Sequence, residues 1–186
     1  MYNMTFIVEG IVIKKQKLKE FDRKYTIFTK INGKIEVIAK GSNKINSKLA
    51  SKLEIFTHSK FMLAHSKIKY RLCQVQNLNN FNYLRKDFKK YFIASKICYF
   101  ADVFTKIQDP EPKVFFLILE TFNLLKTSSN LELLLNFLIK YTKILGVDIK
   151  SKIKLKNNKL YKNFSEKEIK EIIIFLEDYL NFEFSI

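Results

Sequence analysis

The chain has 186 residues, of which 47% are hydrophobic, so it can bury a substantial core as one large domain or two small ones. Its formal net charge of +16 favours an anionic partner, either a nucleic acid or a membrane surface. The composition excludes a disulfide framework, because the two cysteines, Cys73 and Cys98, lie far apart in apolar runs. We expect both to be reduced core thiols of a cytosolic protein.

Neither a secretion signal nor a membrane span is expected. The first residues lack the charged and apolar regions of a signal peptide. The apolar run Phe115–Leu119 is far too short to cross a bilayer. We therefore expect a cytoplasmic protein without a membrane partner.

The positive charge is concentrated in the first part of the chain. Residues 1–80 carry 16 basic and 5 acidic side chains, whereas residues 81–186 carry 18 and 13. A composition rich in Lys, Ile, Asn and Phe is also typical of an AT-rich genome. Codon bias alone, however, does not explain why the excess lies in residues 1–80.

Residues 1–80 are predicted to form five short strands. The dipeptide Asn32-Gly33 is the strongest signal, since Asn-Gly between two β-rich runs indicates a tight hairpin. Alternating apolar and polar residues predict strands over Thr5–Lys15, Tyr25–Ile31, Lys34–Ala39, Leu53–Ala64 and Ile68–Leu78. Five short strands with one long loop favour a small closed barrel of the OB type.

Residues 81–186 are predicted to form an all-helical domain. Apolar residues at helical spacing predict helices over Tyr83–Lys106, Lys113–Lys126 and Leu131–Leu145. Ser165 and Glu168 have the spacing of a capping box, which predicts a last helix ending near Tyr179. The basic segment near residues 150–162 is predicted to form a short hairpin. The expected fold class is therefore α+β, an OB-fold barrel followed by helices.

The loop after the third predicted strand is the strongest candidate for a binding site. It carries Lys40, Lys44 and Lys48 among Gly, Ser and Asn residues, with no acidic residue before Glu54. A flexible loop with only positive charge suits a phosphate-rich polymer. The loop offers no base, nucleophile or metal ligand, and Gly41-Ser42 lacks the spacing of a P-loop. We therefore expect a binding protein rather than an enzyme, with no cofactor.

Other basic residues could extend a nucleic-acid path from this loop, although a solvated surface explains each of them equally well. Those near the strand ends are Lys14, Lys15, Arg23, Lys24 and Lys34. Those on the first predicted helix are Arg85, Lys86, Lys89 and Lys90. Tyr25 and Tyr70 could stack on bases, but core packing is the stronger expectation. Neutralising several phosphates would give salt-sensitive binding that does not depend on sequence.

An ordered series of motifs spans roughly residues 7–125. It begins with Glu9-Gly10-Ile11-Val12-Ile13, and the stretch from Glu20 to Ile35 then reads E-x-x-R-x-x-T-x-x-T-x-x-x-G-K-I. Ala39-Lys40-Gly41-Ser42-Asn43-Lys44 with Ser47-Lys48 follows, and then Leu53–Thr57. Each motif is weak alone, but the series resembles the RecO family of recombination mediators.

The resemblance implies an N-terminal OB fold, a C-terminal helical domain and no catalysis. It implies a DNA repair protein that binds single- and double-stranded DNA, anneals complementary strands and helps to load recombinase onto single-stranded DNA in homologous recombination. The implied partners are a RecR-like mediator and the acidic, apolar tail of single-strand binding protein, which a groove between helices would accept. The implied location is the bacterial cytoplasm, at the nucleoid.

The chain departs from the family pattern after Leu145-Gly146. Many family members carry a four-cysteine zinc motif there, whereas Val147–Lys162 contains no Cys or His. We therefore expect no structural zinc. A generic RNA- or ribosome-associated OB-fold protein is the alternative function. It would share the barrel and the charge but not the long helical domain.

Overall fold

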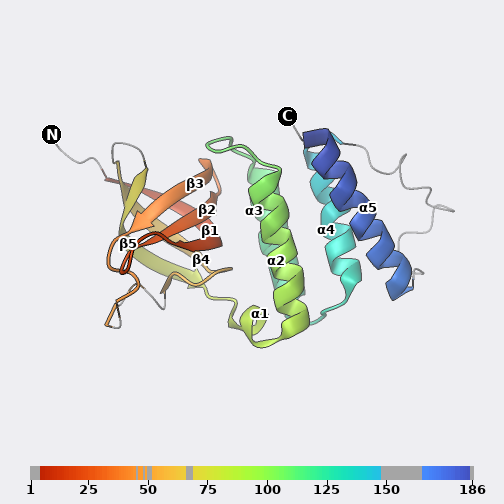
Figure 1. Ribbon diagram of the computed structural model, residues 1–186, viewed down its shortest axis with the longest axis horizontal. Coiled ribbons are helices and arrows are strands. Elements are labelled where there is room, and N and C mark those ends of the chain that lie inside the picture. Colours follow the sequence, from red (N-terminus) through yellow and green to blue (C-terminus); the bar gives the residue numbers. More distant parts are fainter. Residues whose placement is uncertain are drawn as a thin grey trace.

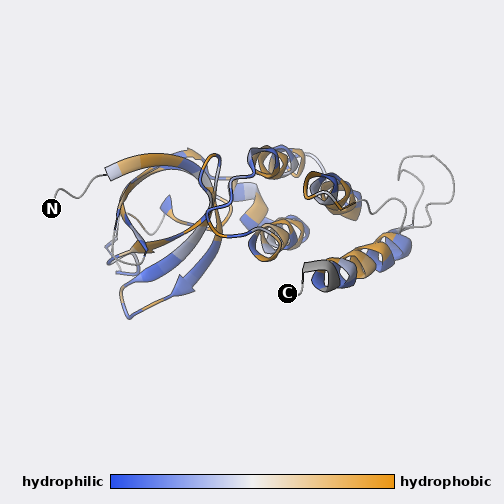
Figure 2. Ribbon diagram, turned by 90° about the horizontal axis from the view of Figure 1, so that it is seen from above, coloured by the Kyte–Doolittle hydropathy of each residue, from blue (hydrophilic) through white to orange (hydrophobic). Residues whose placement is uncertain are grey.

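The computed structural model describes residues 5–44, 46–47, 49, 52–65, 69–147 and 165–184. Within these residues, five strands come first and five helices follow (Figure 1). The helices lie on one side of the strands, and the last helix lies farthest from them in both ribbon views (Figures 1 and 2). The chain is an α+β protein, as predicted.

The strands are β1 (Thr5–Lys17), β2 (Arg23–Thr29), β3 (Gly33–Ala39), β4 (His58–Ala64) and β5 (Tyr70–Asn79). They form a closed barrel in the order β1-β2-β3-β5-β4, in which β3 and β5 run parallel and the other neighbours antiparallel. The long strand β1 pairs with β4 through its first half and with β2 through its second. It therefore joins both edges of the sheet, and Figure 2 shows the resulting ring.

The predicted Asn32-Gly33 hairpin is present. β2 and β3 pair from Thr29 opposite Gly33 to Arg23 opposite Ala39. Gly33 has a φ of +64°, a left-handed conformation that costs a residue with a Cβ about 1–2 kcal/mol. The hairpin also has a tertiary contact, because the Gln108 N–H donates to the Lys34 carbonyl at 2.9 Å.

The fourth strand is shorter than predicted. Leu53–Thr57 forms a turn, and β4 begins only at His58. Phe56 has a φ of 71°, which is incompatible with a strand. Its ring is buried among the helices, whereas Leu53 is buried inside the barrel. The apolar alternation that predicted a strand here thus reflects two different cores.

The helices are α1 (Asn82–Lys86), α2 (Phe88–Val103), α3 (Pro112–Leu124), α4 (Leu131–Ile144) and α5 (Glu166–Phe184). The prediction of one continuous helix over Tyr83–Lys106 is wrong. Asp87 has an extended backbone and separates α1 from α2. Its carboxylate caps α2 by accepting a hydrogen bond from the Lys90 N–H at 3.0 Å.

The capping box at the start of α5 is confirmed. The Ser165 N–H donates to Glu168 Oε2 at 2.7 Å, and the Glu168 N–H donates to Ser165 Oγ at 3.3 Å. The Ser165 hydroxyl also donates to Glu168 Oε2 at 2.7 Å, and this bond, together with that of the Ser165 N–H, lowers the pKa of the Glu168 carboxyl. α5 extends beyond the predicted end at Tyr179. The hairpin predicted near residues 150–162 lies outside the described residues.

The described residues form two hydrophobic clusters, one inside the barrel and one between the barrel and the helices. Neighbouring residues on a strand point to opposite faces, so Val12 and Ile27 face the barrel interior while Ile11 and Phe28 face the helices. The second cluster joins these barrel residues to buried side chains of all four long helices, among them Phe115 of α3. Packing therefore couples the barrel to the helices.

The prediction for Cys73 was wrong. Cys73 is exposed on β5, although Cys98 is buried in α2 as predicted. Burial raises the pKa of the Cys98 thiol far above its usual range, which keeps that thiol protonated. The apolar neighbours of Cys73 face the core while its own position on the strand faces outward.

No helix in the described ranges is both long and apolar enough to span a membrane.

Candidate nucleic-acid interface

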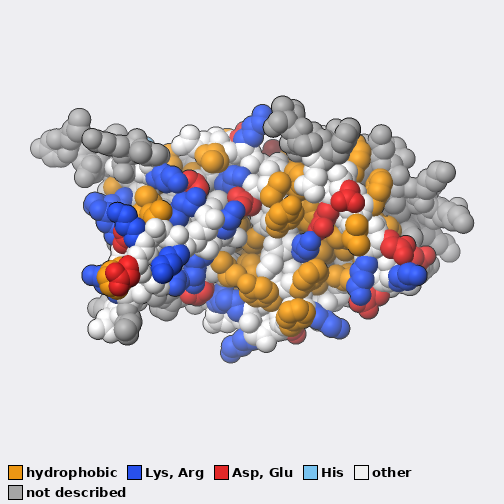
Figure 3. All heavy atoms as spheres, viewed as in Figure 1, with side chains coloured by type: hydrophobic (Ala, Val, Ile, Leu, Met, Phe, Trp, Pro, Cys, Tyr) orange, Lys and Arg blue, Asp and Glu red, His pale blue; other side chains and the backbone are white. Residues whose placement is uncertain are grey.

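Three strand ends meet at one end of the barrel. β1 ends at Lys17, which pairs with Arg23 at the start of β2, and Arg23 pairs with Ala39 at the end of β3. This register places the β1–β2 loop (residues 18–22) beside the basic loop that begins at Lys40. On the face shown in Figure 3, Lys and Arg side chains are frequent over the barrel, while apolar side chains gather over the helices.

Hydrogen bonds join the two loops. The Gly41 N–H donates to Asp22 Oδ1 at 2.8 Å, and the Asn43 N–H donates to the Phe21 carbonyl at 3.0 Å. The Asn43 side-chain amide donates to the Glu20 carbonyl at 3.0 Å, and its oxygen accepts a hydrogen bond from the Arg23 guanidinium. These bonds fix residues 41–43, so the predicted loop is held in place where it leaves β3. We call residues 18–23 and 40–44 the loop platform.

Two of the three loop lysines are exposed on this platform. Lys40 and Lys44 have exposed side chains, and neither forms an ion pair with an acidic residue in the part of the chain that the structure describes. The Lys44 ammonium lies 5.7 Å from the centroid of the Phe21 ring. Lys48 lies outside the described residues. Lys40 and Lys44 are therefore available to contact phosphates.

Three predicted strand lysines are held in ion pairs. Lys14 Nζ lies 2.7 Å from Asp102 Oδ2, and Lys15 Nζ lies 2.9 Å from Glu54 Oε1. Lys24 Nζ lies 2.6 Å from Glu36 Oε1. Partly exposed pairs of this kind contribute only about 0–1 kcal/mol, so a phosphate could replace the carboxylate at small cost. The paired carboxylates nevertheless offset the positive charge of these three lysines. They are therefore weaker candidates for phosphate contacts than Lys40 and Lys44.

Glu36 on β3 pairs with two lysines on the outside of the barrel. Its carboxylate accepts hydrogen bonds from Lys24 and Lys69, and these bonds lower the pKa of the Glu36 carboxyl. The carboxylate stays charged at neutral pH and holds both lysines on the outside of the sheet. It therefore limits the net charge that β2 and β3 present to a polyanion.

Lys34 does not belong to the interface. Its residue is only 8% exposed, and its ammonium contacts both the main-chain carbonyl and the carboxylate of Asp102. The side chain ties β3 to the end of α2 instead of facing solvent. The sequence could not indicate this, because Asp102 lies 68 residues further along the chain.

The predicted basic stripe on the first helix is interrupted. Arg85 donates hydrogen bonds to the carbonyls of Ile55 and Asn80, and burial lowers the pKa of its guanidinium. Lys90 Nζ donates to the Lys126 carbonyl at 3.1 Å. The break at Asp87 separates Arg85 and Lys86 from Lys89 and Lys90. Of the four, Lys86 and Lys89 have exposed side chains.

The two tyrosines serve packing, as expected. Tyr25 is fully buried in the barrel, and this burial raises the pKa of its phenol. Tyr70 is half-buried and lies edge-on to Phe6, with ring centroids 5.3 Å apart.

Among the described residues, no group of three or more His, Cys, Asp or Glu side chains could hold a metal ion.

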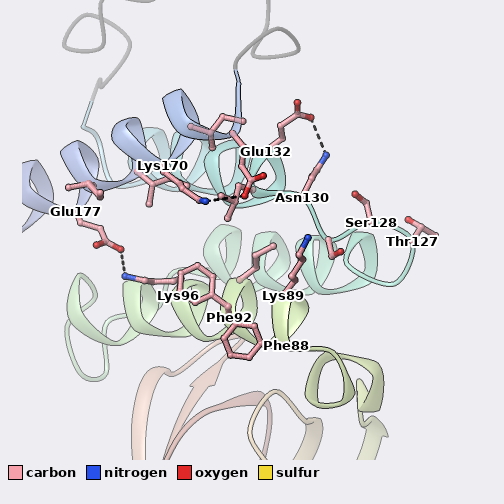
Figure 4. A pocket seen from close by; sticks show the side chains of 17 residues that line it. Phe88, Lys89, Phe92, Lys96, Thr127, Ser128, Asn130, Glu132, Lys170 and Glu177 are labelled. Atoms are coloured by element: carbon pink, nitrogen blue, oxygen red, sulfur yellow. Dashed lines mark hydrogen bonds and ion pairs between the residues drawn. The ribbon is translucent and has the colours of Figure 1, made fainter.

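A cavity that the sequence did not locate lies between α2 and α5. It has a volume of about 930 Å³ and is also lined by the α3–α4 connection (Figure 4). Phe92 and Ile173 provide apolar walls, and Lys89 also lines the cavity. Lys96 Nζ lies 2.5 Å from Glu177 Oε1 across the opening. The apolar periodicity of the helices predicted a buried core, but it could not predict the position of a cavity within it.

A second feature missed from the sequence is Phe21. Its ring is 46% exposed on the loop platform, and Leu18 of the same loop is 43% exposed. The available signal was the presence of apolar residues in a short stretch of charged ones between two predicted strands.

Comparison with known families gives two matches that follow the architecture. The model of the recombination protein O N terminal matches residues 4–81, and that of the recombination protein O C terminal matches residues 85–152. The chain belongs to the RecO family. The first match covers the barrel, and the second begins within α1 and continues past α4.

Individual RecO relatives show the same similarity. The chain is 36% identical over 117 residues to the DNA repair protein RecO of Clostridium perfringens, a match covering 63% of this chain and 44% of the relative. It is 29% identical over 135 residues to that of Roseiflexus sp., covering 73% and 47%. The chain is 31% identical over 123 residues to the DNA repair protein RecO of Alkaliphilus metalliredigens, a match covering 66% of this chain and 50% of the relative. The matched part thus spans about half the length of these relatives.

Proposed function

We propose that this RecO-family chain binds single- and double-stranded DNA through its barrel and anneals complementary strands in homologous recombination. The observation that carries the proposal is the loop platform, where Lys40 and Lys44 are exposed on hydrogen-bonded backbone. The closed five-stranded barrel supports its interpretation as an OB fold, in which the β2–β3 face and the adjoining loops bind oligonucleotides. Family membership does not favour the RNA- or ribosome-associated alternative.

Annealing follows from charge neutralisation. Two strands repel each other through their phosphates, and a basic surface that holds one strand reduces the repulsion felt by the second. Base pairing then provides the specificity, so the protein needs no contacts to base edges. The proposed activity is not enzymatic, since no covalent step or nucleotide is required.

We expect the protein to accelerate annealing of two complementary quenched oligonucleotides by about tenfold or more at low salt, without ATP. Because bound strands release counterions, the acceleration should fall steeply as salt rises about fourfold. Stopped-flow fluorescence with and without protein measures this. An unchanged annealing rate, or a strict need for ATP, would remove the mechanism. Stronger binding to RNA than to DNA of the same sequence would instead favour the alternative function.

The whole recombination activity involves partners. We propose that the chain acts with a RecR-like mediator to load recombinase onto single strands coated by single-strand binding protein. Recombinase assembly on coated strands, measured with and without the chain and the mediator, tests this step. Equal assembly rates in all mixtures would contradict it.

The cavity between α2 and α5 is the proposed site for the acidic, apolar tail of single-strand binding protein. Its apolar walls suit the apolar residues of such a tail, and the Lys89 ammonium in its lining suits an acidic group. Lys96 and Lys170 also line the cavity but already face Glu177 and Glu166. The apolar contacts should therefore contribute most of the affinity.

Phe92→Ala should weaken binding of a fluorescent tail peptide by about tenfold, because Phe92 forms an apolar wall of the cavity. The matched control is Phe116→Ala, which removes another partly exposed ring but one on α3, outside the cavity lining. Fluorescence anisotropy measures both affinities. Equal affinities for the two variants would exclude the cavity as the tail site. DNA binding should be unchanged in both.

A further inference from the structure

The loop platform presents an aromatic ring as well as lysines. Phe21 is 46% exposed. Hydrogen bonds of the surrounding backbone hold it in this position, so the ring cannot turn inward by a shift of the loop. The Phe21 carbonyl accepts the Asn43 N–H at 3.0 Å, and its neighbours Glu20 and Asp22 are bonded to Asn43 and Gly41. The loop is also closed on itself, since the Leu18 N–H donates to the Asp22 carbonyl at 3.0 Å. Polar bonds therefore hold an apolar ring at the surface.

Basic side chains of both loops lie near the ring. The Lys44 ammonium lies 5.7 Å from its centroid, and Lys19 and Lys40 are exposed on the same two loops. A phosphate held by Lys44 would bring the base of the same or the next nucleotide close to the ring. Proteins that bind single strands combine these two elements, a basic path for the backbone and an aromatic platform for the bases.

We propose that Phe21 stacks on an unpaired base and gives the loop platform a preference for single-stranded over double-stranded nucleic acid. This inference rests on the proposed strand-binding function and adds its selectivity. The bases of a duplex are already stacked on each other, so away from its ends a duplex offers Phe21 no free face. The lysines contact phosphates of either form, whereas the ring gains energy only from a single strand.

The chain contains no tryptophan, so Phe21→Trp would place a single indole fluorophore at the proposed stacking position. The matched control is Phe116→Trp. Phe116 is 51% exposed and also has a lysine over its ring, with Lys30 Nζ 5.2 Å from the centroid, but it lies on α3. Titration with a single-stranded oligonucleotide should quench the indole at position 21 strongly and the indole at position 116 weakly. A blunt duplex should quench neither strongly.

A second measurement tests the contribution to affinity. Phe21→Ala and Phe21→Leu should each weaken binding of a labelled single strand by about tenfold, because stacking of one base is lost. Duplex affinity and the dependence of binding on salt should stay unchanged. Leucine keeps an apolar side chain without an aromatic face, so its failure to restore binding would identify stacking as the cause. Circular dichroism of each variant checks that the barrel is folded.

The outcomes separate this inference from the proposed function. If the wild-type chain binds no strand, the proposed function fails and this inference fails with it. If the wild type binds but the Phe21 variants bind single strands equally well, or the two indoles are quenched alike, only the stacking role is excluded. If single-strand and duplex affinities fall together, Phe21 supports the loop structure and does not select strands.

Discussion

Replacing Lys40, Lys44 and Lys48 together by glutamate is expected to lower the affinity for single-stranded DNA by about a hundredfold at low salt. Each lost phosphate contact also removes about 0.7 from the slope of log affinity against log salt concentration, so the slope should fall by about two. Annealing should slow in parallel. Fluorescence titration of a labelled oligonucleotide at several salt concentrations measures both quantities.

The matched control reverses three exposed lysines outside the platform, Lys106, Lys113 and Lys126. This control changes the net charge by the same amount, so it isolates position from total charge. Because Lys40 and Lys44 are exposed, the variant at Lys40, Lys44 and Lys48 should lose no more than about 0.5 kcal/mol of unfolding free energy per site. Equal losses of affinity in the two triple variants would exclude the platform as the specific site and leave only a diffuse charge effect.

Gly33→Ala is expected to destabilise the protein by about 3–4 kcal/mol, the largest effect of any single substitution proposed for this chain. A Cβ at Gly33 would lie 2.3 Å from the Asp109 carbonyl oxygen and 2.6 Å from the Asp109 nitrogen. These are backbone atoms, so the β2–β3 turn and the segment after α2 would have to separate. The left-handed φ of +64° adds a further cost. Urea unfolding measures the change.

Gly146→Ala is the control for the conformational part of this cost. Gly146 has a φ of +80°, but a Cβ there would meet nothing within 4 Å. It should therefore cost only the strain of a left-handed residue, about 1–2 kcal/mol. Similar losses in the two variants would show that contact between the barrel turn and the α2–α3 connection contributes little to stability.

Local signals predicted the regular elements well. The Asn32-Gly33 turn and the capping box at Ser165 are confirmed because each depends on residues within four positions of each other. The helices over Pro112–Leu124 and Leu131–Ile144 follow their apolar periodicity closely. Errors arose where apolar spacing had another cause, as at Phe56. They also arose where the backbone leaves the helical conformation at one residue, as at Asp87, whose side chain caps the start of α2.

The candidate site divides in the same way. Composition and spacing are properties of the chain, so they predict the excess of positive charge in the first 80 residues and an acid-free loop containing Lys40 and Lys44. Which of these charges are available to a partner depends on contacts formed in the folded chain. Lys34 is bound by Asp102 and Lys15 by Glu54, while Asp22 and Asn43 join two loops so that Phe21 is held at the surface. These partners are about twenty or more residues apart in the sequence. Strand register brings the two loops together, whereas packing of α2 against the barrel brings Asp102 to Lys34.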